Sequence, residues 1–361
     1  MIETSACFSA DYHEARSKFL EAAIAAGGSV ESITHPERGP DGRALFTEIA
    51  TFGVERAEKV LVLISGTHGV EGFCGSGAQI DLLRRGEIAR LPDGMGLLMI
   101  HAINPFGFAW LRRVTHENID LNRNWVDFGA PLPQNSAYAE LHPFICPDRW
   151  DTEAQVASAQ AMQSFADEHG EAAMRLAVTG GQYEHPDGLF FGGTARSWSQ
   201  VTQASIFATY LSHASQVAVI DYHTGLGPWG FGEQIVITPR SSSQFARAAK
   251  WYGSAIASVA DGASSSAKIG GDGLSAVAGL LPYAEVTCMA LEVGTLPAGQ
   301  MLQALLADCW LHAHGDPLSD AARPIKRQIR QAFYGDTDYW KGMVAGQSLL
   351  AVRQALAGLS G

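Results

Sequence analysis

Apolar and polar positions alternate along the N-terminal third of the chain with first a helical and then a strand-like spacing. Residues 11–26 carry apolar side chains at helical spacing and are followed by Gly27 and Gly28, which predicts a helix. Residues 32–34 and 44–52 flank a turn-rich segment at 36–42, which predicts a hairpin at the edge of a sheet. The continuous apolar runs 59–64 and 96–103 are typical of buried strands, with a helix predicted between them at 75–85.

The same alternation continues through the rest of the chain. We predict strands at 216–221, 234–238 and 286–293, and helices at 152–169, 197–214, 244–260 and 298–312, with a largely helical tail from residue 324. Strands that alternate with helices predict an α/β fold, with a mixed, largely parallel central sheet and helices on both faces. The Gly/Ser/Asp-rich segment 261–273 is interpreted as a surface loop rather than a linker, so we expect a single domain over residues 1–361.

Composition narrows the possible partners. The chain has 25 basic and 37 acidic residues among 361, a net charge of −12, which argues against binding to nucleic acid. The first residues lack a basic segment followed by an apolar stretch, and no apolar run is long enough to span a bilayer, so we expect a cytoplasmic protein without a membrane partner. The five cysteines are scattered, which argues against a disulfide framework and a thiolate metal site. The sequence leaves the oligomeric state open.

Polar residues of catalytic type follow three of the predicted strands. His68 and Glu71 follow the strand at 59–64 within a glycine-rich segment, His223 follows the strand at 216–221, and Glu292 lies near the end of the last strand. Ligand sites in open α/β sheets gather at the carboxyl ends of strands. Two imidazoles and one carboxylate, with a fourth position left to water, form a usual catalytic zinc site, so His68, Glu71 and His223 are candidate ligands. The alternatives are a helix N-terminus stabilised by Glu71 and a structural role for each histidine.

Two further segments carry candidate functional groups. Arg123, with Asn122, could hold a substrate carboxylate, because the arginine fork matches a carboxylate bidentately; the alternative is a loop that satisfies its own hydrogen bonds. Glu292 is a single acid among apolar neighbours. Such a carboxyl group is expected to have a raised pKa suited to proton transfer, although a buried salt bridge would also explain it.

Taken in order, His68-x-x-Glu71, Asp120-Leu-Asn122-Arg123-Asn124, His223 and Glu292 resemble the zinc carboxypeptidase superfamily, which includes the succinylglutamate desuccinylase and aspartoacylase-type deacylases. The chain is most similar to an uncharacterised bacterial branch of that superfamily. The resemblance spans residues 60–295 and rests most on the Asp-x-Asn-Arg-Asn element.

The resemblance implies a role for each matching residue. It implies one Zn²⁺ per chain held by His68, Glu71 and His223, with Asp120 orienting His68. It also implies that Asn122 and Arg123 bind the substrate carboxylate and that Glu292 is the general base and acid. An arginine that polarises the scissile carbonyl should precede the Asn-Arg pair, which makes Arg113, or else Arg112, the candidate.

The function expected from this resemblance is hydrolysis of an amide bond next to a free carboxylate in a small peptide. The alternatives are an N-acyl amino acid deacylase and, in another class, a metal-free module that binds an acidic ligand. Two segments remain without a firm assignment. Tyr283 is a weak candidate for a tyrosine that closes over the substrate, and the segment 180–193 could form a pocket wall or a connecting hairpin.

Overall fold

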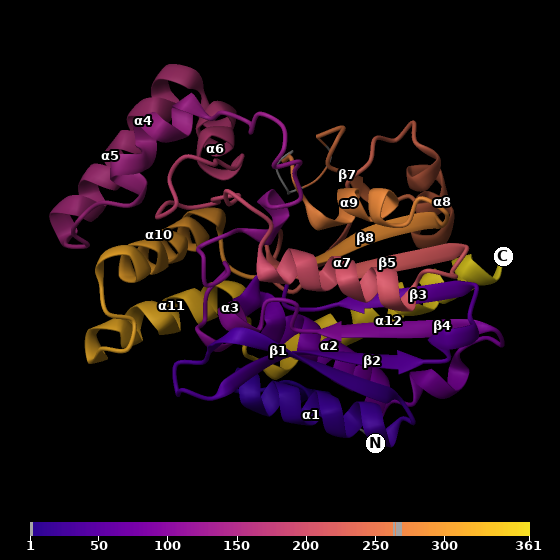
Figure 1. Ribbon diagram of the computed structural model, residues 1–361. Helices are drawn as coiled ribbons and strands as arrows, with labels where there is room; N and C mark the ends of the chain where they lie inside the picture. Colours follow the sequence, from indigo (N-terminus) through magenta and orange to yellow (C-terminus); the bar gives the residue numbers. More distant parts are fainter. Residues whose placement is uncertain (1–2, 263, 265–268) are drawn as a thin grey trace.

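A mixed β-sheet forms the centre of the computed structural model, which describes residues 3–262, 264 and 269–361 (Figure 1). Eight strands lie within these residues, in the order β1-β2-β4-β3-β5-β8-β6-β7. Neighbouring strands are parallel at β4–β3, β3–β5, β5–β8 and β6–β7, and antiparallel at β1–β2, β2–β4 and β8–β6. The strands are β1 (Ser29–Arg38), β2 (Ala44–Phe52), β3 (Lys59–Ile64), β4 (Met95–His101), β5 (Gln216–Gly225), β6 (Gly232–Val236), β7 (Ala257–Ser258) and β8 (Glu285–Gly294).

Helices cover both faces of this sheet (Figure 1). The α-helices of the described residues are α1 (Tyr12–Ala25), α2 (Gly72–Arg84), α3 (Pro105–Ala109), α4 (Ser136–Ile145), α5 (Thr152–His169), α6 (Glu171–Thr179), α7 (Trp198–Tyr210), α8 (Ser243–Tyr252), α9 (Gly273–Leu280), α10 (Ala298–His314), α11 (Arg323–Phe333) and α12 (Asp338–Ser360). The predicted fold class, a mixed and largely parallel sheet between two helical layers, is confirmed.

The two layers follow from the alternation of side chains along each central strand. In β3, Leu61 and Leu63 pack in the core beneath α1, α2 and α12, whereas Val60 and Val62 pack in the core beneath α7 and α9. Successive side chains of a strand point to opposite faces, so an uninterrupted apolar run fits a strand that is buried on both sides. This is why β3 shows no apolar–polar alternation.

Helices α4, α5 and α6 stand together beside α10, at the upper left of Figure 1. A separate apolar cluster joins α4 and α6 to α10, and it includes Tyr138, Leu141, Val178, Phe190 and Leu306. This helical group therefore stands over one end of the sheet, and α6 contributes side chains to the cavity described below.

Most predicted elements are present with small shifts at their ends. The hairpin is confirmed as β1 and β2, with β1 at the sheet edge. The helix predicted at 244–260 was too long, because α8 ends at Tyr252 and residues 257–258 form β7. The predicted loop 261–273 ends at α9, whose N-cap is Asp272, and its residues 263 and 265–268 lie outside the described residues.

None of the helices within the described residues combines the length and the apolar character that crossing a bilayer requires.

Candidate active site

The turn after β3 brings His68 and Glu71 to the carboxyl end of the sheet. The short 3-10 helix η3 (Gly69–Glu71) leads directly into α2. Gly69 has a φ of +26°, and a Cβ placed there would lie 2.3 Å from the Arg112 carbonyl oxygen. The Val70 amide donates to this same carbonyl at 2.8 Å. Only glycine fits so close to the neighbouring backbone, and the close approach fixes the direction of both side chains.

His223 and Glu292 lie side by side on adjacent parallel strands. They are direct partners in the register of β5 and β8. Both follow the alternation that points Val219 and Ala290 toward the α7 and α9 face, so their side chains leave the sheet on the same side. Regular strand pairing therefore holds a histidine and a glutamate at adjacent positions.

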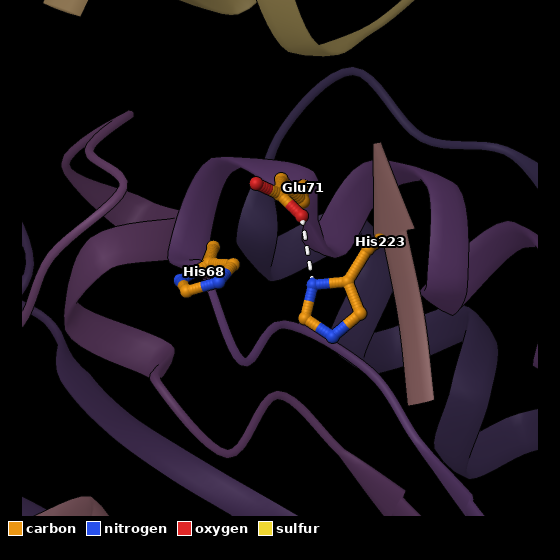
Figure 2. Close-up of side chains that lie close together, drawn as sticks. All are labelled: His68, Glu71 and His223. Carbon is orange, nitrogen blue, oxygen red and sulfur yellow. Dashed lines mark hydrogen bonds and ion pairs between the residues drawn. The ribbon is translucent and has the colours of Figure 1, made fainter. Parts of the chain in front are cut away.

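His68, Glu71 and His223 converge on one point. One ligand atom from each residue lies within 4.8 Å of the others, and all three side chains are buried. Figure 2 shows the His223 imidazole, which projects from a strand, facing the Glu71 carboxylate, with 3.3 Å between His223 Nδ1 and Glu71 Oε2. Sequence reasoning predicted this grouping, and the three residues are brought together from elements far apart in the chain.

Asp221 orients the His223 ring. Its Oδ2 lies 2.8 Å from His223 Nε2, while its carboxylate accepts a hydrogen bond from Thr67 Oγ1 at 2.9 Å. Burial alone would lower the pKa of His223, but the carboxylates of Asp221 and Glu71 raise this pKa well above its usual value. With Nε2 held by Asp221, Nδ1 is the nitrogen directed at Glu71. Sequence reasoning missed Asp221, although its position two residues before His223 on a strand places both on one face.

Arg113 occupies the opposite side of the group. Its guanidinium donates to Glu71 Oε1 at 2.8 Å and to Asp120 Oδ2 at 3.0 Å, and its Nη2 lies 2.8 Å from His68 Nε2. Burial lowers the pKa of His68, and the adjacent Arg113 charge lowers it further, so this imidazole is neutral. Asp120 Oδ1 lies 3.7 Å from His68 Nδ1. Burial would raise the pKa of Asp120, but the Arg113 guanidinium holds it below its usual value.

Arg112, the other predicted arginine, points away from this group. It donates to Asp308 at 3.2 Å and to Asn118 at 2.8 Å, within a buried network that also contains Lys326. Of the two arginines, therefore, Arg113 is the one beside His68 and Glu71.

Asn122 and Arg123 follow Asp120 on the short helix η5 (Leu121–Arg123). Asn122 Nδ2 lies 3.1 Å from His68 Nε2, and its Oδ1 accepts from the Gly273 amide at 3.0 Å. Arg123 is 3% exposed and donates to the carbonyl oxygens of Asn122 and Thr179, but its Nε has no hydrogen-bond partner within the described part of the chain. This buried guanidinium donates to neutral carbonyl groups while the Asp120 and Asp272 carboxylates act on it at longer range, so it can still bind an anion.

Glu292 is buried among these groups. Its Oε1 accepts from the Leu226 amide at 3.0 Å. Burial and the nearby Glu71 carboxylate raise the pKa of Glu292 to about 7, although His223 and Arg113 oppose this rise. A carboxyl group with a pKa near neutrality is suited to both accept and donate a proton.

A cavity of about 540 Å³ opens beside these residues. His68, Arg113, Arg123, His223 and Glu292 all line it. Its remaining wall is mostly apolar and includes Met174, Val178, Ile235, Leu274, Met301, Leu302 and Phe333, while Arg175, Glu171 and Asp272 add charges. A small molecule that entered this cavity would therefore meet both the titratable groups and an apolar surface.

Phe190 is a cavity residue that sequence reasoning did not single out. Its ring lies 5.5 Å from the Arg113 guanidinium and 5.2 Å from that of Arg123, and its backbone has a φ of 53°. The segment 180–193 thus contributes to the cavity wall through Phe190, whereas Tyr183 donates to the Arg123 carbonyl at 2.7 Å. Tyr283 is 51% exposed and is not among the residues that line the cavity.

The central group fits a divalent metal ion in three respects. Its donors are two imidazole nitrogens and a carboxylate oxygen within bonding reach of one centre. The carboxylate of Asp221 holds the far nitrogen of His223, as carboxylates do for metal-binding histidines. His68 Nδ1 is buried and has no hydrogen-bond partner in residues 3–262, 264 and 269–361. Because Arg113 now contacts His68 and Glu71, metal binding requires its guanidinium to turn aside.

Comparison with known proteins gives one family match. The family model described as "Protein of unknown function (DUF2817)" matches residues 8–347. No curated protein matches the chain.

Solved structures with a similar fold include bovine thrombin-activatable fibrinolysis inhibitor in complex with tick carboxypeptidase inhibitor, at 10% identity and a TM-score of 0.49, over 98% of this chain and 97% of that chain. Carboxypeptidase A from Helicoverpa armigera is similar at 12% identity and a TM-score of 0.48, over 96% and 73% of the two chains. Succinylglutamate desuccinylase from Chromobacterium violaceum is similar at 14% identity and a TM-score of 0.38, over 86% and 72%.

Proposed function

This chain belongs to the DUF2817 family, and we propose that it is a zinc-dependent hydrolase that cleaves an amide bond next to a free carboxylate in a small peptide. The observation that carries the proposal is the convergence of His68, Glu71 and His223, with Glu292 buried on the adjoining strand and lining the same cavity. In this proposal residues 1–361 form a single catalytic domain, because one sheet positions all four groups.

His68, Glu71 and His223 would hold one zinc ion per chain. Nitrogen donors favour zinc over calcium or magnesium, which prefer oxygen ligands. Bound there, zinc supplies the Lewis acidity that activates water and polarises a carbonyl group. Asp221 fixes the His223 ring through a hydrogen bond, and Asp120, 3.7 Å from His68 Nδ1, would orient the second ring once the metal is bound.

Glu292 acts as the general base and then as the general acid. It takes a proton from the attacking water and returns that proton to the leaving amine. Both steps suit a carboxyl group whose pKa lies near 7. Arg113, once turned from Glu71 toward the cavity, donates hydrogen bonds to the oxyanion that develops on the attacked carbonyl, which lowers the barrier.

Arg123 binds the free carboxylate of the substrate. Its guanidinium lines the cavity, donates to the backbone carbonyls of Asn122 and Thr179, and has an Nε without a hydrogen-bond partner among the described residues. A substrate carboxylate would compensate this buried charge and set the position of the amide bond. Asn122, whose amide lies against His68, supports the ring in this arrangement and contributes to the same end of the cavity.

Deacylation of an N-acyl amino acid is a second candidate function, favoured by the composition of the cavity. Arg175 adds a further positive charge to a wall that is otherwise mainly apolar. An N-acyl amino acid with an apolar acyl group would place its carboxylate on an arginine and its acyl chain on the apolar wall. Release of free amine from a panel of N-acyl amino acids and short peptides, measured with the zinc-loaded protein, separates the two substrate classes.

The deciding experiment is the substitution Glu292→Gln. Its amide cannot accept the proton of water, so hydrolysis should fall by about 10²–10⁴-fold while zinc remains bound at one equivalent per chain. Zinc is measured by elemental analysis and turnover by amine release. Glu285→Gln, an exposed residue at the other end of the same strand, is the matched control and should retain full turnover.

Two results would contradict the proposal. Retained turnover in Glu292→Gln would remove this residue from the mechanism. Protein purified without chelator that is free of metal, and that binds an acidic ligand without cleaving it, would instead identify a metal-free binding module based on Arg123 and Asn122.

A further inference from the structure

A second group of metal-ligating side chains lies between α4 and the segment 180–193. One ligand atom from each of His142, His185 and Asp187 lies within 4.8 Å of the others. His142 comes from α4, whereas His185 and Asp187 come from the segment that also carries Phe190. None of the three lines the cavity of the candidate active site. The group is therefore separate from His68, Glu71 and His223.

Two of its nitrogens are buried without a partner. Among the residues that the structure describes, none forms a hydrogen bond with His142 Nδ1 or His185 Nε2, and the two imidazole rings stack at 3.9 Å with 25° between their planes. A buried polar nitrogen that makes no hydrogen bond costs free energy, and native proteins contain few. The unpartnered His185 Nε2, in a ring stacked on that of His142 beside the Asp187 carboxylate, is explained if these side chains bind something that is not part of the chain.

The spacing suits a metal ion. His142 Nε2 lies 3.4 Å from Asp187 Oδ1. Two ligands that each bind a tetrahedral ion at about 2.0–2.1 Å lie about 3.3 Å apart, so these atoms are already near the required separation. The His142 and Asp187 side chains are 15% and 44% exposed, so an ion can enter from solvent.

We propose that His142, His185 and Asp187 bind a divalent transition-metal ion of the zinc class. Two imidazoles and one carboxylate select such an ion over calcium or magnesium. The stacked rings must rotate for His142 Nε2 and His185 Nε2 to reach the same ion. Within the described residues, His185 Nε2 has no hydrogen bond that would have to break. The inference does not depend on the proposed hydrolysis.

The role of this site is structural. The ion would join α4 to the segment 180–193, whose Gly181 and Gly192 pack against Arg123 and whose Phe190 lines the cavity. A metal that links distant segments stabilises the folded state, because the unfolded chain does not offer a preformed site. Metal binding here should therefore raise the melting temperature and hold this wall of the cavity.

A neighbouring group shares the Asp187 carboxylate and has to be distinguished from this site. Cys146, Asp187 and His314 also place ligand atoms within 4.8 Å, with 3.8 Å between Cys146 Sγ and His314 Nε2. A cobalt(II) ion bound by a thiolate has an intense charge-transfer absorption in the near ultraviolet, whereas one bound by imidazole and carboxylate does not. The absorption spectrum therefore reports which group holds the ion.

The test begins with the double variant His68→Ala/His223→Ala, which lacks two ligands of the candidate active site. Titrated with Zn²⁺ and followed by calorimetry, it should still bind one equivalent and gain melting temperature. Adding His142→Ala and His185→Ala should abolish both effects, while adding His169→Ala, an exposed histidine at the end of α5, should change neither. The cobalt(II) form should lack the thiolate absorption.

Each other result overturns the proposal. The proposal is wrong if the variant His68→Ala/His223→Ala binds no zinc. It is also wrong if zinc still binds after His142 and His185 are replaced as well. A thiolate absorption that disappears in Cys146→Ser would move the ion to the neighbouring group. If circular dichroism shows that the quadruple variant does not fold, two milder single variants of the wild-type chain, His142→Gln and Asp187→Asn, replace it. Each should lower the bound zinc by one equivalent without preventing turnover.

Discussion

Arg113 determines the charge balance of the candidate active site. It contacts Glu71, Asp120 and His68, so one guanidinium compensates two buried carboxylates and restrains a metal-ligand candidate. A divalent cation held by His68 and Glu71 must replace two of these three contacts. The contact with Asp120 can persist, and it would keep Arg113 attached beside the ion with its free nitrogens turned to the cavity.

The substitution Arg113→Gln separates two roles of this arginine, its competition with the metal ion and its stabilisation of the oxyanion. Removal of the competing positive charge should tighten zinc binding by about 10-fold, which corresponds to about 1.4 kcal/mol. Loss of the oxyanion donor should lower turnover by about 10²–10³-fold. Zinc affinity is measured by competition with a chelator, and Arg196→Gln, at an exposed position, serves as the control. Weaker zinc binding, or unchanged turnover, would contradict this account.

Phe190 illustrates what residue-level reasoning from sequence cannot reach. The amino-acid sequence of the segment 180–193 does not indicate that the Phe190 ring lies near two arginines, or that Phe190 has a backbone φ of 53°. His68, Glu71 and His223 were predictable because their chemistry is specific and strand ends meet at one edge of a sheet. Asp221 and Phe190 act through their position beside other side chains, which only the folded chain defines.

Among the elements, the turn between β3 and α2 is the one on which the site depends most. Gly69 lies against the Arg112 carbonyl, so the backbone that directs His68 and Glu71 is packed against the backbone that precedes Arg113. The metal-ligand candidates and the proposed oxyanion donor are thereby held as one unit.

Gly69→Ala should disturb both parts of this unit. A Cβ 2.3 Å from a carbonyl oxygen forces the backbones apart, so we expect zinc binding and turnover to be lost together. The control is Gly94→Ala, which has a φ of +76° and open space around its Cβ position. It should lose only about 1–2 kcal/mol of unfolding free energy, from backbone strain, and keep its activity. If Gly69→Ala bound zinc normally, the proposed rigidity of the turn would be wrong.

Buried strands could be predicted from the sequence more readily than short helices at the surface of the sheet. The strands β3, β4, β5 and β8 were predicted because continuous apolar runs bounded by glycine or polar residues are specific to buried strands. Helix α9 was not predicted, since its short sequence contains two glycines. Its start depends on the Asp272 side chain, which accepts from the Ser275 amide, and its stability on packing against β8. Such tertiary contributions leave no periodic signal in the sequence.

At the scale of the whole molecule, buried neutral histidines should set the acid limit of stability. Burial lowers the pKa of His101 to about 3 and that of His35 to about 4. In the unfolded chain both would take up a proton near pH 6.5. The unfolded state therefore binds more protons below this pH, so the free energy of unfolding must fall as the pH decreases from about 6.5 toward 4.

His101→Gln tests this at a position far from the candidate ligands in the chain. The glutamine cannot be protonated but can still bond to Ser76, which lies 2.8 Å from His101 Nε2. Between pH 6.5 and 4.5, the wild type should lose roughly 2–3 kcal/mol more stability than the variant. Urea denaturation across this pH range measures the difference, and His169→Gln, an exposed histidine, should retain the wild-type slope. Equal slopes for His101→Gln and the wild type would refute the assignment.

The pairing of His223 with Glu292 has a consequence for how this protein could acquire new specificity. Because both residues belong to the interior of one hydrogen-bonded ladder, their separation is set by the spacing of strands, about 4.8 Å, and does not depend on loop conformation. Insertions or deletions in the surrounding connections can reshape the chamber without altering the reacting pair. A shift of β8 by a single residue, in contrast, would turn the acid to the opposite face and abolish the chemistry at once. Changes in substrate specificity within this fold should therefore occur in the loops that connect the strands and helices, while the His223–Glu292 pair stays unchanged.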